Sequence, residues 1–292
     1  MKIGYPCINR GIGCTANSTF RIANFSEKLI TKKIKDNLFC LNRILDYNIK
    51  KGLLFFRISS DVIPFAGHED VFFDWQNRFK SEIKSIGEKI KKEDMRISMH
   101  PDQFVLINSI REDVVKKSIL ELDWQCDLLD LMELDSSAKV QIHVGGVYGD
   151  KEASVERFIS NYSTLSSKIK KRLVVENDDR LYSLQDCLRV GVPVLFDTFH
   201  HQCLNNGESL GEAVLLAEKT WDSRLMVDYS SQETGARKGK HTESINEKDF
   251  LSFLLDTSGV DFDVMLEIKD KEKSALKALK IIQKYEKNLQ KQ

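Results

Sequence analysis

Short apolar runs alternate with longer amphipathic stretches along the chain. Runs rich in β-branched and aromatic residues, bounded by polar residues or glycine, predict strands at 2–8, 53–59, 96–100, 140–146, 172–178, 193–200, 224–231 and 262–269. Several are apolar at consecutive positions, which is typical of parallel strands buried on both faces. Apolar residues three and four positions apart predict helices at 27–51, 74–91, 113–134, 152–169, 183–190, 208–219, 246–256 and 271–289.

The alternation of these elements favours one fold class. Eight strands, each followed by a helix, predict an α/β protein folded as a single (β/α)8 TIM barrel over residues 1–292. Such a barrel needs about 250 residues, so the length fits one domain with short extensions. No strand is followed by a GxGxxG or Walker pattern, which argues against the usual nucleotide-binding folds.

Composition narrows the class of protein. Lys+Arg and Asp+Glu are equal at 44 each, which argues against histone-like bulk affinity for nucleic acid. No apolar run reaches the ~18 residues that a membrane helix needs, and we expect no membrane partner. The N-terminal apolar run is too short for a signal peptide. The six cysteines form no CxxC pair, so we expect reduced thiols in a cytoplasmic protein. Nothing indicates an obligate dimer, and we expect a monomer.

The chemistry lies at the ends of the predicted strands. Histidines and carboxylates close or nearly close six of the apolar runs: His100, His143, Glu176, Asp197, Asp228 and Glu267. A parallel barrel brings these ends to one face. Burying an unpaired carboxylate costs several kcal/mol, so these acids are expected to be metal ligands or members of ion pairs. Imidazole and carboxylate ligands without cysteine suit manganese, zinc or ferrous iron. The set predicts a polynuclear metal site.

The remaining histidines also fall at strand ends or in the loops that follow. His68 and His241 lie in such loops, and His200 is adjacent to His201 in the predicted sixth strand. Neighbouring residues of a strand point in opposite directions, so we expect only one of that pair to be a ligand.

Several segments together resemble a known family. The sequence is similar to the UV damage endonucleases, collinearly over almost the whole chain, in GYPCIN (4–9), SMHPDQFV (98–105), HVGGVYGDK (143–151), LVVENDDRLY (173–182), FDTFHHQ (196–202) and GKH (239–241). That family resembles the endonuclease IV type of abasic-site nuclease. The resemblance implies a TIM barrel with a three-metal cluster, commonly of manganese, at its C-terminal face.

The resemblance also implies roles for individual residues. His100, His143 and Glu176 would hold one ion, and Glu176 would bridge to a second ion. Asp197, Asp228 and Glu267 would complete the second site, and His200 and His241 would hold a third ion. His68 would be an accessory ligand or proton-handling group, so that the implied catalytic residues are Glu176, His68 and Glu267. The cofactor would be two or three divalent ions, with manganese expected and zinc, magnesium or cobalt as alternatives.

The chain departs from the family on the seventh strand. Several members have Lys-Val-His there, with the lysine modified to a carboxylate-like ligand, whereas this chain has Met226, Val227 and Asp228. Asp228 can donate oxygen to a hard cation. Met226 cannot replace an anionic ligand, which puts the third ion in doubt.

Further residues are candidates for contact with damaged double-stranded DNA. The family inserts a Gln-aromatic pair at the lesion, which is Gln103 and Phe104 here; the alternative is a phenylalanine packed on the barrel rim. Tyr5 and Asn9 resemble positions near the damaged bases. Arg237, Lys238 and Lys240 would contact the DNA backbone or form a solvated charge run.

The function implied by the resemblance is DNA repair. We expect an endonuclease that nicks duplex DNA immediately 5′ of UV photoproducts and other distorting lesions, leaving a 3′-hydroxyl and a 5′-phosphate. One alternative is an abasic-site endonuclease with the same metal chemistry. Others are a metal-dependent sugar isomerase or epimerase on a similar barrel, and a non-enzymatic binder of damaged DNA.

Overall fold

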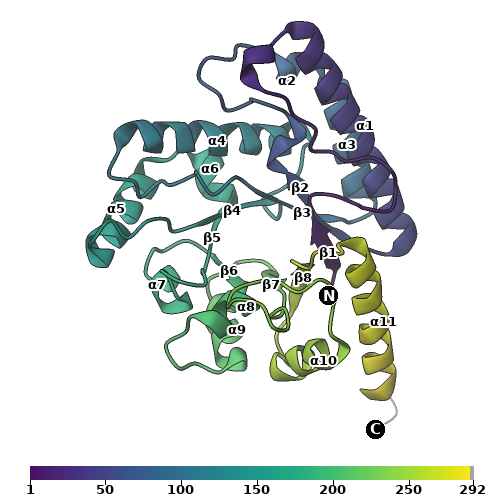
Figure 1. Cartoon of the computed structure of the whole chain (residues 1–292), viewed down its shortest axis with the longest axis vertical. Helices are drawn as coiled ribbons and strands as arrows, with labels where there is room; N and C mark the ends of the chain where they lie inside the picture. The colour runs from purple at the N-terminus through teal and green to yellow at the C-terminus, as the bar shows by residue number, and fades with distance from the viewer. Residues whose placement is uncertain (290–292) are drawn as a thin grey trace.

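The strands form a closed parallel barrel. The computed structural model describes residues 1–289, and in it the strands pair in sequence order, with β8 returning to β1. Figure 1 shows them near the centre, with helices around them. The strands are β1 (Ile3–Pro6), β2 (Phe55–Ser59), β3 (Arg96–His100), β4 (Lys139–His143), β5 (Leu173–Glu176), β6 (Val194–Asp197), β7 (Leu225–Tyr229) and β8 (Phe262–Leu266). The predicted (β/α)8 fold class is confirmed.

The helices follow the predicted pattern with some subdivision. They are α1 (Glu27–Lys51), α2 (Trp75–Arg78), α3 (Lys80–Lys92), α4 (Glu112–Leu131), α5 (Lys151–Thr164), α6 (Ser167–Arg172), α7 (Leu184–Leu188), α8 (Thr198–Cys203), α9 (Leu210–Glu218), α10 (Glu247–Asp256) and α11 (Glu272–Leu289). The helix expected at 152–169 is divided because Leu165 and Ser166 are extended and the Ser166 side chain caps α6. None of the helices within residues 1–289 has both the length and the apolar character that a membrane crossing requires.

The barrel interior has an apolar layer beneath a polar one. A buried cluster unites Phe55, Val174, Leu195, Met226 and Met265, one from each of five strands. Side chains two positions apart on a strand point the same way. Two residues further along the same five segments lie Arg57, Glu176, Asp197, Asp228 and Glu267. The fold therefore places one arginine and four carboxylates in one layer at the C-terminal end of the barrel.

The sixth strand is shorter than predicted. The run 193–200 was expected to be one strand, but β6 ends at Asp197 and α8 begins at Thr198. The cause is local, because the Asp197 carboxylate accepts a hydrogen bond from the His200 backbone N–H at 2.7 Å and caps the helix. His200 and His201 consequently lie on a helix, and the expectation that they alternate along a strand was wrong.

A disulfide corrects the expectation that all six cysteines are thiols. Cys14, in the loop after β1, is bonded to Cys40 on α1, with their Cα atoms 6.0 Å apart. The two residues are 26 positions apart, a spacing with no local signature. They meet because the loop folds back over α1, where Arg43 donates a hydrogen bond to the Ile12 carbonyl at 3.1 Å.

Reducing this disulfide is expected to destabilise the fold. A cross-link that closes a loop of this length stabilises a protein by about 3–4 kcal/mol by restricting the unfolded chain. Cys40→Ser should therefore lower the melting temperature by roughly 5–8 °C, as measured by calorimetry. Cys203→Ser, which removes a half-buried free thiol, is the matched control. An identical melting curve for Cys40→Ser and the unaltered protein would contradict the prediction.

Candidate metal centre

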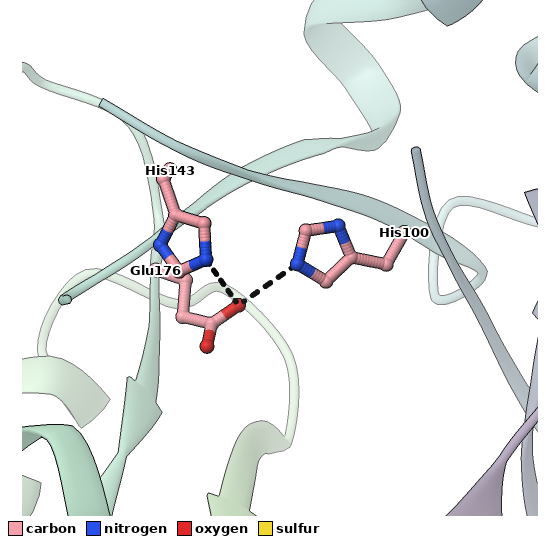
Figure 2. A group of neighbouring side chains, drawn as sticks. All are labelled: His100, His143 and Glu176. Atoms are coloured by element: carbon pink, nitrogen blue, oxygen red, sulfur yellow. Dashed lines mark ion pairs between the residues drawn. The ribbon is translucent and has the colours of Figure 1, made fainter. Parts of the chain in front are cut away.

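One carboxylate lies between two histidines at the ends of neighbouring strands. Figure 2 shows the rings of His100 and His143 facing the carboxylate of Glu176. The Oε2 atom of Glu176 is 3.4 Å from Nε2 of His100 and 3.9 Å from Nε2 of His143. Three residues that were predicted to hold one ion thus converge, with ligand atoms within 4.8 Å of one another.

Glu176 also faces a second group. Its other oxygen, Oε1, is 3.4 Å from Nδ1 of His200, and Oδ2 of Asp197 is 3.7 Å from the same nitrogen. Glu176, Asp197 and His200 form another set whose ligand atoms lie within 4.8 Å of one another. The two oxygens of Glu176 therefore point to different groups, which is the geometry that a bridging carboxylate requires.

The third group consists of three carboxylates, and the side chain of an arginine already binds two of them. Asp197, Asp228 and Glu267 lie within the same distance of one another. The Arg57 guanidinium donates to Oδ2 of Asp228 at 2.6 Å and also to Oε1 of Glu267. Gln141 donates from Nε2 to Glu176 at 2.7 Å and to Asp228 at 3.0 Å. Neither Arg57 nor Gln141 was among the residues expected from the sequence, although an arginine within the apolar run 53–59 was a signal.

Three imidazoles are oriented by backbone carbonyls. The Nδ1 atoms of His100, His200 and His241 lie 2.8, 2.9 and 2.8 Å from the carbonyl oxygens of Pro101, Asn177 and Glu267. A carbonyl only accepts, so each Nδ1 carries a proton, and Nε2 is the nitrogen that has a lone pair for an ion when the ring is neutral. Metal-ligating histidines are commonly held in this way.

The electrostatics of the layer favour cations. Burial raises the pKa of Asp197 to about 6, and the carboxylates of Glu176 and Glu267 contribute. Burial opposes ionisation of Glu176 as well, but His143, His100 and His200 together hold its pKa well below the usual range. Burial lowers the pKa of His200, yet Asp197 and Glu176 outweigh it and raise that pKa to about 11. Four close carboxylates thus stabilise positive charge here.

The donor set fits divalent ions. Oδ2 of Asp197 and Oδ1 of Asp228 are buried and have no hydrogen-bond partner within residues 1–289. Burying an oxygen atom without a partner costs free energy unless another group, such as a metal ion, binds it. Together with the free Nε2 atoms of the histidines, they form a mixed oxygen and nitrogen donor set suited to manganese or zinc. The residues present are therefore compatible with a metal cluster.

The other predicted histidines occupy different positions. The His241 ring lies 6.0 Å from the His200 ring, centroid to centroid, at the edge of the cluster and in none of the three groups. His68 is exposed and lines a neighbouring pocket, which shares Asp102 and Phe104 with the groove at the cluster. No hydrogen bond or ion pair within residues 1–289 joins His68 to the cluster. His201 is buried against Phe196, its Nε2 lies 3.2 Å from the Glu208 carbonyl oxygen, and it belongs to none of the three groups.

The candidate DNA contacts divide into exposed and buried residues. Gln103 and Phe104 are exposed in a turn after β3, beside an open groove of about 840 Å³ that is lined by the cluster residues His100, His143 and Glu267. Arg237, Lys238 and Lys240 are exposed in the loop after β7, with no ion pair to a carboxylate within residues 1–289.

Tyr5 and Asn9 lie beneath the surface. The Tyr5 hydroxyl donates to Asn48 at 2.6 Å and accepts from Asn9 at 2.8 Å. Asn9 also accepts from the Gly11 N–H at 2.8 Å. In this conformation the pair supports the loop after β1 and does not line the groove.

Comparison with known proteins gives consistent matches over the whole chain. The family model described as UV-endonuclease UvdE matches residues 2–291. A UV DNA damage endonuclease from Clostridium perfringens is 39% identical over 99% of this chain and 72% of its own length. The crystal structure of SacUVDE is 46% identical, covers 98% of this chain and 99% of that chain, and has a TM-score of 0.95.

More distant solved structures share the barrel alone. Endonuclease IV from Thermus thermophilus is 16% identical over 85% of this chain and 94% of that chain, with a TM-score of 0.56. D-psicose 3-epimerase from Clostridium cellulolyticum is 14% identical over 82% and 91%, with a TM-score of 0.55. At these identities the two likenesses show the shared fold and do not extend to activity.

Proposed function

Because the chain belongs to the UV-endonuclease UvdE family, it is a DNA repair endonuclease, and we propose that it nicks duplex DNA immediately 5′ of UV photoproducts and other distorting lesions. The products would be a 3′-hydroxyl and a 5′-phosphate. We also propose that the protein is a monomer that acts in the cytoplasm on its DNA substrate. Because Cys14 and Cys40 form a disulfide, the cysteines no longer argue for that location.

The observation that supports a metal-dependent reaction is the set of oriented imidazoles around Glu176. His100 donates Nδ1–H to a carbonyl and has Nε2 3.4 Å from Oε2 of Glu176, whereas His200 has its Nδ1 both beside a carbonyl and 3.4 Å from Oε1 of Glu176. We propose manganese as the ion, held by His100, His143, Glu176, Asp197, His200 and His241 with the free oxygens of Asp228 and Glu267. Bound divalent ions supply Lewis acidity and an activated water at neutral pH.

The protein residues would select and position the DNA. Phe104 is 74% exposed at the edge of the groove, where an apolar ring can enter the gap between poorly stacked bases. Damaged bases are already weakly stacked, so displacing them costs less than displacing intact ones. Arg237, Lys238 and Lys240 would contact phosphates beside the groove. Those contacts position the duplex and carry no sequence information.

A nicking assay tests this proposal. Labelled duplexes carrying one pyrimidine dimer, one abasic site or no damage would be incubated with manganese, and separately with a chelator. The expected result is a single cut directly 5′ of the dimer that requires the metal. Cutting at the abasic site alone would favour the abasic-site alternative. The absence of cutting with any divalent ion would overturn the proposal and direct attention to sugar substrates.

A further inference from the structure

The cluster has three ligand groups that differ in composition. The group of His100, His143 and Glu176 and the group of Glu176, Asp197 and His200 both contain histidine. The group of Asp197, Asp228 and Glu267 contains carboxylates alone. It is also the group beside which Arg57 is buried, with both terminal nitrogens donating to Asp228 and Glu267.

Arg57 belongs to the same layer as the ligands. It follows Phe55 by two positions, as Asp228 follows Met226 and Glu267 follows Met265, and all three apolar residues meet in one interior cluster. The Arg57 side chain is 3% exposed. Its guanidinium is therefore fixed in the barrel interior and cannot turn to solvent.

Strand β7 offers an additional ion only one ligand residue. Met226 is the inward-facing residue of β7 before Asp228, and it is wholly buried among Phe55, Val174, Leu195 and Met265. A thioether in an apolar layer offers no charge and only a weak acceptor to a hard cation. Strand β7 consequently contributes the single carboxylate of Asp228, one oxygen of which already accepts from Arg57 and Gln141.

The charge balance points the same way. The cluster contains the four carboxylates of Glu176, Asp197, Asp228 and Glu267, and Arg57 reduces their net charge from minus four to minus three when the histidines are neutral. Two divalent ions bring that total to plus one, whereas three bring it to plus three. Coulomb repulsion scales with the product of the charges, so a guanidinium beside a divalent ion is repelled half as strongly as a third divalent ion would be.

We propose that Arg57 takes the place of a metal ion in this cluster. It is a fixed cation bound to Asp228 and Glu267. The cluster holds two divalent ions, centred on the two histidine-containing groups, and the other ligands proposed above complete their coordination. This inference rests on the metal dependence of the proposed function. It makes Arg57 a positioning residue, because the guanidinium acts through the two carboxylates that it holds.

Counting bound manganese tests the inference. Metal-free protein would be titrated with Mn²⁺ while the six-line electron paramagnetic resonance signal of free Mn²⁺ is followed. The signal of the unaltered protein is expected to rise after two equivalents. In Arg57→Gln the carboxylates of Asp228 and Glu267 are no longer neutralised and can bind an ion. The signal of this variant should therefore rise only after three equivalents. Arg57→Lys keeps the charge and should restore the count of two.

Arg96→Gln is the matched control. Arg96 is also a buried arginine on a barrel strand, paired with Asp263 at 2.9 Å at the opposite end of the barrel, and its loss should leave the count at two. Three ions in the unaltered protein would overturn the inference, and that measurement does not depend on any variant folding. A count of two in a folded Arg57→Gln variant would overturn it as well.

The same experiment separates this inference from the proposed function. Protein that binds two ions but does not nick the dimer-containing duplex would refute the function and leave the role of Arg57 standing. Protein that nicks the duplex but binds three ions would support the proposed function and refute the role of Arg57. Protein that binds no manganese would refute both.

Discussion

Replacing Glu176 with glutamine is expected to lower the single-turnover nicking rate by on the order of 10³-fold or more, the size of effect seen when a group that stabilises transition-state charge is removed. The carboxylate is 1% exposed and directs one oxygen to His100 and His143 and the other to His200. Glutamine preserves the shape but removes the charge, and its NH₂ group would face one of the two ion positions. The rate would be measured on a duplex with a single pyrimidine dimer, in saturating manganese.

Metal analysis should accompany that measurement. The Glu176→Gln variant should bind fewer manganese ions than the unaltered protein while keeping its circular dichroism spectrum. Glu121→Gln is the control, because Glu121 is another largely buried glutamate but lies on α4 outside the ligand groups, where it accepts from Gln125 at 3.0 Å. A Glu176→Gln enzyme that nicks at the unaltered rate would refute a metal cluster centred on Glu176.

The fold and the layer of candidate ligands could be predicted from the sequence because both depend on short-range patterns. Strands buried on both faces are continuously apolar, so a carboxylate at the end of such a run, as at Glu176 or Asp197, marks both the end of the strand and its chemistry. A parallel barrel then brings those ends together whatever their separation along the chain.

Arg57 and Gln141 could not be assigned in the same way, because their partners are set by the closed barrel. Arg57 contacts Asp228 and Glu267, which are 171 and 210 positions away. Nothing local distinguishes an arginine that neutralises ligands from one that reaches solvent. The Cys14–Cys40 disulfide also depends on how the loop after β1 packs on α1.

Helix α8 was missed for a different reason. The residues 193–200 have strong strand propensity, and the Asp197 side chain overrides it by capping a helix. The start of that helix turns His200 toward Glu176, so the capping interaction itself positions a proposed ligand.

Replacing Phe104 with alanine is expected to lower the preference for damaged over undamaged duplex by about 10- to 100-fold, since an aromatic ring stacked on a base contributes about 1–3 kcal/mol. The ring is 74% exposed, but its loop is held firmly on both sides. The Val105 N–H donates to the Asp102 carbonyl at 3.0 Å, and the Leu106 N–H donates to the Ser118 hydroxyl at 2.8 Å. An exposed ring on a rigid loop loses little conformational entropy when it enters a duplex.

The rates of nicking on dimer-containing and undamaged duplexes, compared at equal manganese, measure that preference. Phe104→Tyr retains a ring and should keep most of the discrimination, and the manganese content of both variants should match that of the unaltered protein. Phe39→Ala is the control, because Phe39 is 65% exposed on the outer helix α1 and its loss should leave the ratio unchanged. If Phe104→Ala slows nicking of both duplexes equally, the ring does not recognise the lesion, and selectivity must come from how readily the damaged duplex bends.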